Sequence, residues 1–141
     1  MTETPAPAPV LNALSIVVAD MAAAIDFYSL CGLEFAEGSA DAPHAETSVG
    51  AMKIMFDTHA VVESFSPGWT VPTGGQRMAL AFECPTTESV DATHDALVRA
   101  GYRSHLEPFD AVWGQRYAVV LDPDDNSVDF YCPTGPDTTP N

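Results

Sequence analysis

Basic residues are scarce in this sequence. Lysine and arginine number 5 against 20 aspartates and glutamates, which gives a formal net charge of −15. A surface with this charge repels phosphate backbones and anionic lipid headgroups, so we expect neither nucleic acid nor a membrane as a partner. The acidity favours cationic small molecules, although it can also serve solubility alone.

Cysteines and long apolar runs are equally scarce. The 3 cysteines form no CxxC pair, which excludes a disulfide framework and a cysteine-based zinc site and predicts buried thiols. No apolar run reaches membrane-spanning length. The N-terminal MTETPAPAPV lacks the basic region and apolar core of a signal peptide. We therefore expect a cytoplasmic protein that begins with a flexible arm over residues 1–10.

The remainder of the sequence is typical of a single globular domain. Of the 141 residues, 46% are hydrophobic and 18% charged. In the first half, Leu11–Asp20 predicts a strand, and Asp20 is expected to cap a helix over Met21–Cys31. Gly32 is suited to end that helix in a left-handed conformation. The strands expected next are Leu33–Ala36, Ala45–Val49 and Met52–Phe56.

The second half repeats this order of elements. Met78–Cys84 predicts a strand, Thr86 or Thr87 the cap of a helix, and Gly101 the end of that helix. One face of the helix is expected to carry Val90, His94, Leu97 and Val98. The strands expected after it are Tyr102–Leu106, Arg116–Leu121 and Val128–Tyr131.

The repetition predicts two βαβββ modules, over residues 11–57 and 77–133. Residues 58–76 form a linker with a short helix at Thr58–Phe65 and a Pro/Gly-rich loop that could act as a lid. A flexible tail is expected over residues 134–141. Because one module leaves a bare sheet face, two modules side by side predict an α+β fold, a cupped mixed sheet with a cavity in its concave face.

Two segments resemble the vicinal oxygen chelate superfamily, which includes glyoxalase I, extradiol dioxygenases, fosfomycin-modifying enzymes and bleomycin-resistance proteins. They are FYSLCGLEF after the first helix cap and WGQRYAVVLDPDDNSVDFY near the C-terminus. The resemblance extends over about Leu11 to Pro133 and implies this fold and a homodimer. Members usually carry glycine where Asp125 stands, which implies a left-handed backbone at this position.

The resemblance also implies four positions for the ligands of a divalent metal. The two first-strand positions fall on Ala13 and Arg77, and neither side chain can bind a metal. One last-strand position falls on Asp129, which is competent, and its counterpart falls on the strand of Lys53, Met55 and Asp57. No HxH or HxxxH pair is formed by His44, His59, His94 and His105. We therefore expect no metal and no other cofactor.

This departure points to members that keep the cavity and lose the metal. The function implied is a binding protein that sequesters an aromatic or cationic natural product, as in antibiotic resistance. The alternative is an enzyme: a metal-dependent lyase, isomerase or dioxygenase, or a metal-free natural-product tailoring enzyme. For a metal-free enzyme, His105 and Glu107 are the candidate acid and base, because residues i and i+2 of a strand share a face.

Aromatic side chains are the main candidates for ligand contact, because they stack on flat molecules and attract cations. Trp113 precedes the next-to-last strand, where core or dimer packing is the alternative role, and Trp69 lies in the linker. Arg116 is expected to form an ion pair with Asp122 or Asp124. The resemblance implies that the side chains of Lys53, Met55 and Asp57 face the cavity. Asp129 and Tyr131 are expected on the opposite side of it. The ligand-binding residues expected are Trp113, Trp69, Met55, Lys53, Asp57, Tyr117, Asp129 and Tyr131.

Overall fold

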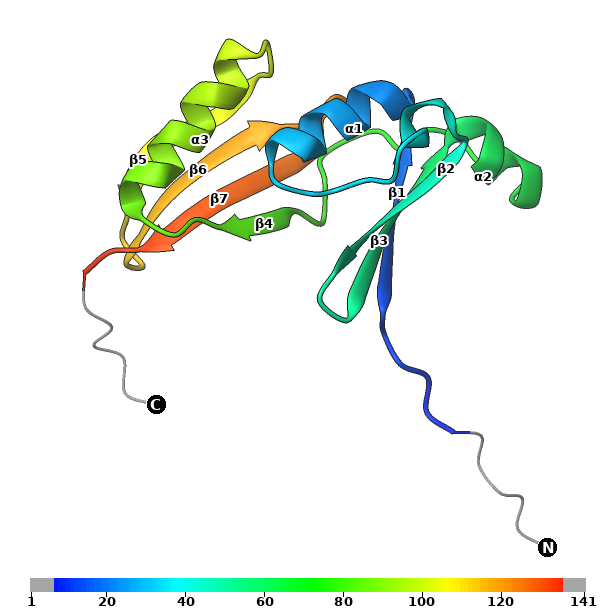
Figure 1. Ribbon diagram of the computed structural model, residues 1–141, viewed down its shortest axis with the longest axis horizontal. Helices are drawn as coiled ribbons and strands as arrows, with labels where there is room; N and C mark the ends of the chain where they lie inside the picture. The colour runs from blue at the N-terminus through cyan, green and yellow to red at the C-terminus, as the bar shows by residue number, and fades with distance from the viewer. Residues whose placement is uncertain (1–6, 136–141) are drawn as a thin grey trace, which may run out of the picture.

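Two β-sheets with helices on one side form the protein in the computed structural model, which describes residues 7–135 (Figure 1). The first sheet has the strand order β1-β3-β2, with β1 and β3 parallel and β2 and β3 antiparallel. Its strands are β1 (Ala13–Val18), β2 (His44–Val49) and β3 (Met52–Thr58). Most of the expected N-terminal arm, residues 1–6, and most of the expected tail, residues 136–141, lie outside the described residues.

The second sheet has four strands in the order β4-β7-β6-β5, of which only β4 and β7 are parallel. The strands are β4 (Leu80–Glu83), β5 (Ser104–Ala111), β6 (Gln115–Leu121) and β7 (Ser127–Pro133). The helices are α1 (Met21–Leu30), α2 (His59–Phe65), α3 (Thr87–Arg99) and a 3-10 turn, η1 (Ser39–Asp41). This α+β arrangement is the predicted fold.

The helix boundaries follow from the caps that the sequence indicates. The Asp20 side chain accepts a hydrogen bond from the backbone N–H of Ala23, and the Thr86 side chain accepts one from Ser89. Gly32 ends α1 at a φ of 98° and Gly101 ends α3 at a φ of 102°. A side chain at these positions would be strained, so the predicted role of both glycines is confirmed.

One hydrophobic core joins the two sheets. In β3, Ile54 and Phe56 are buried and face α1, while the alternate residues face the other way. The aromatic ring of Tyr28 in α1 packs against Phe56, and that of Phe27 packs edge-on against Tyr102 after α3. Helix α1 therefore packs against both halves of the chain, and α1 and α3 lie on the same side of the sheets (Figure 1).

The strand expected at Leu33–Ala36 is not present. This segment is joined to β2 by a side-chain hydrogen bond and not by a ladder of backbone bonds. The Thr47 hydroxyl donates to the backbone oxygen of Glu34 at 2.7 Å. Leu33 and Phe35 still pack against the core. These two apolar side chains are thus buried by packing alone, without a strand. Among the described residues, the first sheet has three strands.

Two smaller expectations also differ from the structure. Val98 was expected on the buried face of α3, but its side chain is 41% exposed, because Val90, His94 and Leu97 already fill the narrow stripe that meets the sheet. The strand expected at Tyr102–Leu106 corresponds to β5, which begins at Ser104 and continues to Ala111. Its pairing with β6 has register irregularities.

The turn between β6 and β7 is built around Asp122. Its side chain accepts hydrogen bonds from the backbone N–H groups of Asp124 and Asn126. Asp125 has a φ of 66°, which confirms the left-handed backbone implied at this position. Within residues 7–135 we found no helix of the length and apolarity that a membrane crossing needs.

Candidate functional site

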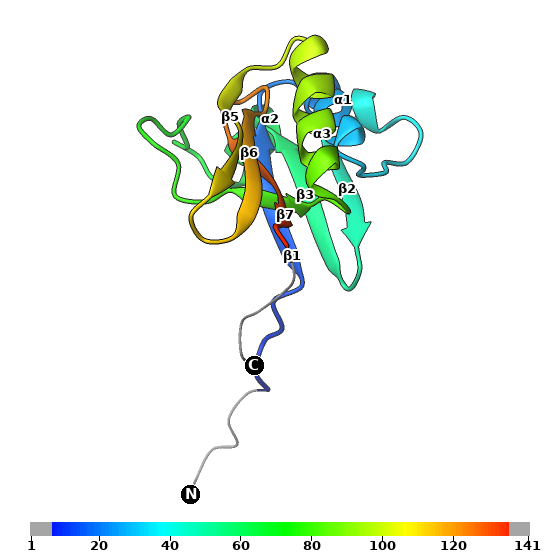
Figure 2. The same ribbon diagram turned by 90° about the vertical axis from the view of Figure 1, so that its left-hand side faces the viewer.

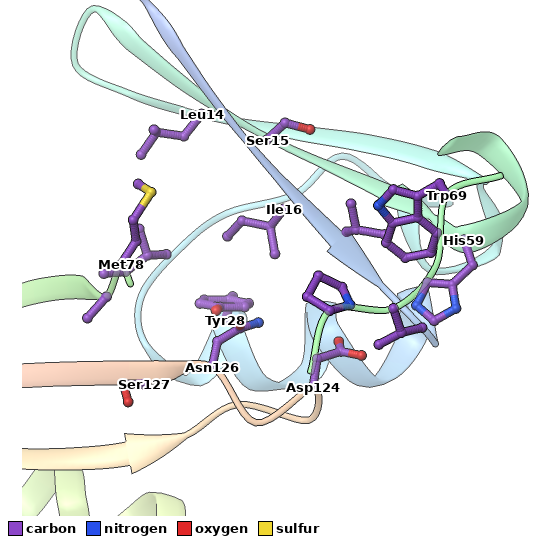
Figure 3. Close-up of a pocket in the computed structure, with 15 residues that line it drawn as sticks. Leu14, Ser15, Ile16, Tyr28, His59, Trp69, Met78, Asp124, Asn126 and Ser127 are labelled. Carbon is purple, nitrogen blue, oxygen red and sulfur yellow. The ribbon is translucent and has the colours of Figure 1, made fainter. Parts of the chain in front are cut away.

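A pocket of about 320 Å³ lies between the two sheets, where β1 and β4 are the edge strands that face each other (Figure 3). One wall comes from residues 14–17 of β1 and the other from residues 78–80 at the start of β4. The loop between α2 and β4 supplies Trp69, Val71 and Pro72, and the β6–β7 turn supplies Asp124 and Asn126. Figure 2 shows that this loop protrudes from the side of the molecule away from α1.

Apolar side chains line much of the pocket, with the polar Ser15, Asn126 and Ser127 among them. Leu14 and Met78 lie at one end, and Ile16 and the ring of Tyr28 lie in the middle (Figure 3). The Tyr28 hydroxyl donates a 2.7 Å hydrogen bond to Asp122 Oδ2. Burial, followed by Asp122, raises the pKa of Tyr28 far above its ordinary value, so the phenol stays protonated. Tyr28 is fully buried, with 0% of its surface exposed, so it lies behind the pocket lining and offers no free surface of its own.

The other end carries His59, Trp69 and Asp124 (Figure 3). The imidazole of His59 and the indole of Trp69 lie with their ring centres 5.1 Å apart. Asp124 is half-buried, and its Oδ1 accepts a 3.0 Å hydrogen bond from the backbone N–H of Ala19. Burial is the largest cause that raises the pKa of Asp124. The two ionisable side chains His59 and Asp124 thus lie together at this end of the pocket (Figure 3).

Most of the residues expected to bind a ligand lie elsewhere, on the faces of the sheets that are turned away from α1 and α3. We call these the open faces. On the open face of the first sheet, Lys53, Met55 and Asp57 alternate along β3 with Ile54 and Phe56, and Asp57 is itself buried. Asp57 lies within hydrogen-bond distance of His44 and Ser15, and Lys53 is 3.6 Å from Glu46. This face is a network of charged side chains.

The open face of the second sheet is aromatic instead. Tyr117 donates a hydrogen bond to Asp129, and Tyr131 stands opposite Tyr117 in the ladder of β6 and β7. Burial and then Asp129 raise the pKa of Tyr117 to about 12. Trp113 packs edge-on against Tyr117 and Phe109, and its indole N–H donates to Gln115. Trp113 remains 58% exposed, so it is not a core residue of the described chain.

Of the expected ligand-binding residues, only Trp69 lines the pocket between β1 and β4. His59, Asp124 and Tyr28 also line the pocket, and the sequence indicates other roles for the first two. It offers His59 as a candidate metal ligand and Asp124 as a partner of Arg116. Tyr28 lies on the apolar stripe of α1, where nothing in the sequence separates a pocket wall from a core residue.

Arg116 has other partners than expected. Its guanidinium donates to Asp91, at 2.9 and 3.0 Å, and to Asp110 at 3.2 Å. By alternation along β6, Arg116 lies on the side covered by α3, which carries Asp91, so the expected ion pair with Asp122 or Asp124 does not form. This geometry follows from the helix that packs on the sheet.

The candidate acid and base of a metal-free enzyme are both exposed. His105 and Glu107 lie on β5, and neither side chain has a hydrogen-bond partner within residues 7–135. The pairing of β5 with β6 is irregular between Ser104 and Phe109, which removes the regular alternation that would turn both side chains the same way.

The residues at the four positions implied for a metal do not fit one. Ala13 has no donor atom and Arg77 is an exposed cation. Asp129 accepts from Tyr117 on one sheet, while Asp57 accepts from Ser15 on the other. Within residues 7–135, no three His, Cys, Asp or Glu side chains are placed to hold a metal together. The side chains at these four positions thus do not form the ligand set that the superfamily's divalent metal needs.

His44 bridges two carboxylates. Its Nδ1 is 2.6 Å from Asp57 Oδ1 and its Nε2 is 3.0 Å from Glu46 Oε2. When both nitrogens are protonated, each donates to a carboxylate. These hydrogen bonds, with Asp57 the larger cause, raise the pKa of His44 above its ordinary value. The protonated imidazole is therefore favoured in the folded state.

The expected consequence is a pH-dependent contribution to stability. Because the folded-state pKa of His44 is raised, its stabilisation is complete below the unfolded pKa of about 6.5 and is lost as pH rises through the folded value. His44→Ala should therefore destabilise more near pH 6 than near pH 9, by a fraction of a kcal/mol because the site is exposed. Urea unfolding at both pH values measures this. His105→Ala is the control, and equal effects of His44→Ala at both pH values would contradict the prediction.

Comparisons with known proteins agree on the family. Residues 10–130 match the family model "Glyoxalase/Bleomycin resistance protein/Dioxygenase superfamily". A family enzyme of that description from Burkholderia phytofirmans PsJN is 24% identical, with a TM-score of 0.75 over 86% of this chain and 97% of that one. A glyoxalase-related enzyme from Fulvimarina pelagi is 18% identical, with a TM-score of 0.74 over 92% and 95%. At these identities, the solved structures show the shared fold alone. A search of curated proteins found no match.

Proposed function

The chain belongs to the glyoxalase/bleomycin resistance protein/dioxygenase superfamily, and we propose that it binds a small aromatic or cationic molecule without a metal. The pocket between β1 and β4 carries this proposal. Its volume of about 320 Å³ is that of a small-molecule site, and its lining is mainly apolar with a few polar groups. The misfit of the metal positions supports binding without a metal.

The biological role we propose is sequestration of a natural product, as in resistance to an antibiotic. The family description includes bleomycin resistance proteins, and a protein that holds its ligand by burial and stacking needs no reacting group. The homodimer and the cytoplasmic location expected from the sequence stay predictions.

The two tryptophans provide the test of where the ligand binds. A thermal-shift screen of flat aromatic amines and alcohols identifies a ligand, because a molecule that binds only the folded state raises the melting temperature. Trp69→Ala should then weaken binding about tenfold or more, since it removes stacking worth roughly 0.5–1.5 kcal/mol together with buried area, and about 1.4 kcal/mol is tenfold.

Trp113→Ala is the matched control, because it removes the same side chain from the open face of the second sheet. Isothermal titration calorimetry of both variants should show a loss of affinity for Trp69→Ala alone. If Trp113→Ala weakens binding and Trp69→Ala does not, the ligand lies on the open face, as the sequence alone suggested, and the pocket assignment is wrong.

A further inference from the structure

We propose that the pocket between β1 and β4 takes an amphiphilic amine, with its apolar body against Leu14 and Ile16 and its ammonium group on the carboxylate of Asp124. The inference rests on the proposed function and adds the chemical class of the ligand and the group that selects it. It is carried by the position of Asp124 in the pocket and by the placement of the cations of the chain.

Asp124 has a free oxygen at the polar end of the pocket. Its Oδ1 is used by the backbone N–H of Ala19, while its Oδ2 has no hydrogen-bond partner within residues 7–135. The pocket lining holds His59 and Asp124 as its only side chains that commonly ionise near neutral pH. His59 aside, the pocket lining therefore carries one negative charge and no positive charge.

Four of the five lysine and arginine side chains are paired with carboxylates elsewhere. Lys53 lies by Glu46, Arg99 by Asp95, Arg103 by Asp125 and Arg116 by Asp91. Arg77 is exposed and does not line the pocket. Burial, followed by the acidic neighbours Asp122 and Asp20, raises the pKa of Asp124, against the opposing effects of the Ala19 hydrogen bond and of His59. A carboxylate whose charge is disfavoured in this way gains strongly from an incoming cation.

The shape of the pocket indicates the chemical character of the rest of the ligand. Figure 3 shows Asp124 and His59 at one end, Leu14 and Met78 at the other, and the Tyr28 ring between them. A ligand with its charge at Asp124 therefore places its body along Ile16 and Leu14, since the Tyr28 ring behind them is fully buried. An apolar body suits this surface, because removal of apolar area from water is favourable.

Three probes of nearly equal shape test the charge requirement. They are 2-(2-naphthyl)ethylamine, 2-(2-naphthyl)ethanol and 2-naphthylacetate, titrated by calorimetry into the full chain. We expect the amine to bind at least tenfold more tightly than the alcohol, and the acetate to bind most weakly. Asp124→Asn should remove the preference for the amine and change the affinity of the alcohol less than twofold.

Asp124→Asn is suited to this test because the amide oxygen of asparagine can still accept the Ala19 hydrogen bond. Asp125→Asn is the matched control: it removes the same charge from the same turn, but Asp125 pairs with Arg103 and does not line the pocket. Its preference for the amine should equal that of the wild type. A melting curve of each variant establishes that it is folded.

The outcomes separate this inference from the proposed function. If the amine and the alcohol bind the wild type equally, the pocket binds small molecules but the ammonium assignment is wrong. The same holds if Asp125→Asn removes the preference as fully as Asp124→Asn, since the effect is then long-range attraction by the net charge. If no probe binds at millimolar concentration, the proposed function of the pocket fails together with the inference.

Discussion

Asp122→Ala is expected to lower the free energy of unfolding by about 3–5 kcal/mol, a large part of the total for a domain of this size. Asp122 is only 3% exposed. Its Oδ1 accepts from the backbone N–H groups of Asp124 and Asn126, and its Oδ2 from the Tyr28 hydroxyl and the Asn126 side chain. The variant leaves these donors without an acceptor, and each unsatisfied buried donor costs about 1–3 kcal/mol.

Chemical unfolding of Asp122→Ala and of a charge-matched control measures this effect. Asp26→Ala also removes one negative charge from the acidic chain, but Asp26 is exposed on α1, so its effect should stay within about 0.5 kcal/mol. Tyr28→Phe removes one of the donors and should fall between the two. Equal stabilities of Asp122→Ala and Asp26→Ala would show that the turn does not depend on the buried carboxylate.

Phe27→Ala is expected to cost about 3–5 kcal/mol as well, through a cavity in the core. Phe27 is fully buried in α1, with 0% of its surface exposed, and its ring packs edge-on against Tyr28 and Tyr102. The contact with Tyr102 joins α1 to the second half of the chain. The variant should therefore weaken the attachment between the halves as well as the local packing.

Thermal unfolding followed by circular dichroism tests both effects. Phe65→Ala removes the same side chain from α2, where it is 69% exposed, and should change stability by less than about 0.5 kcal/mol. Phe27→Leu should lose less than Phe27→Ala, because it leaves a smaller cavity. If Phe27→Ala were as stable as Phe65→Ala, α1 would not hold the two halves together.

Features that depend on neighbouring residues were predictable from the sequence. The caps at Asp20 and Thr86 depend on residues within one helical turn, and Gly32 and Gly101 are needed because the backbone there is left-handed. The two faces of β3 follow from strict alternation. The superfamily resemblance, confirmed over residues 10–130, added the fold and the left-handed residue Asp125.

The tertiary structure decided which side chains meet. Arg116 meets Asp91 because α3 lies over β6, and Leu33 is buried without a strand because its packing needs no ladder. The pocket combines β1, the loop before β4 and the β6–β7 turn, segments far apart in the sequence. The sequence by itself thus determined most of the elements, the helix caps and the faces of β3, because these depend on local backbone geometry. The position of the pocket depended on α1, whose packing on both halves sets where the edges of β1 and β4 lie.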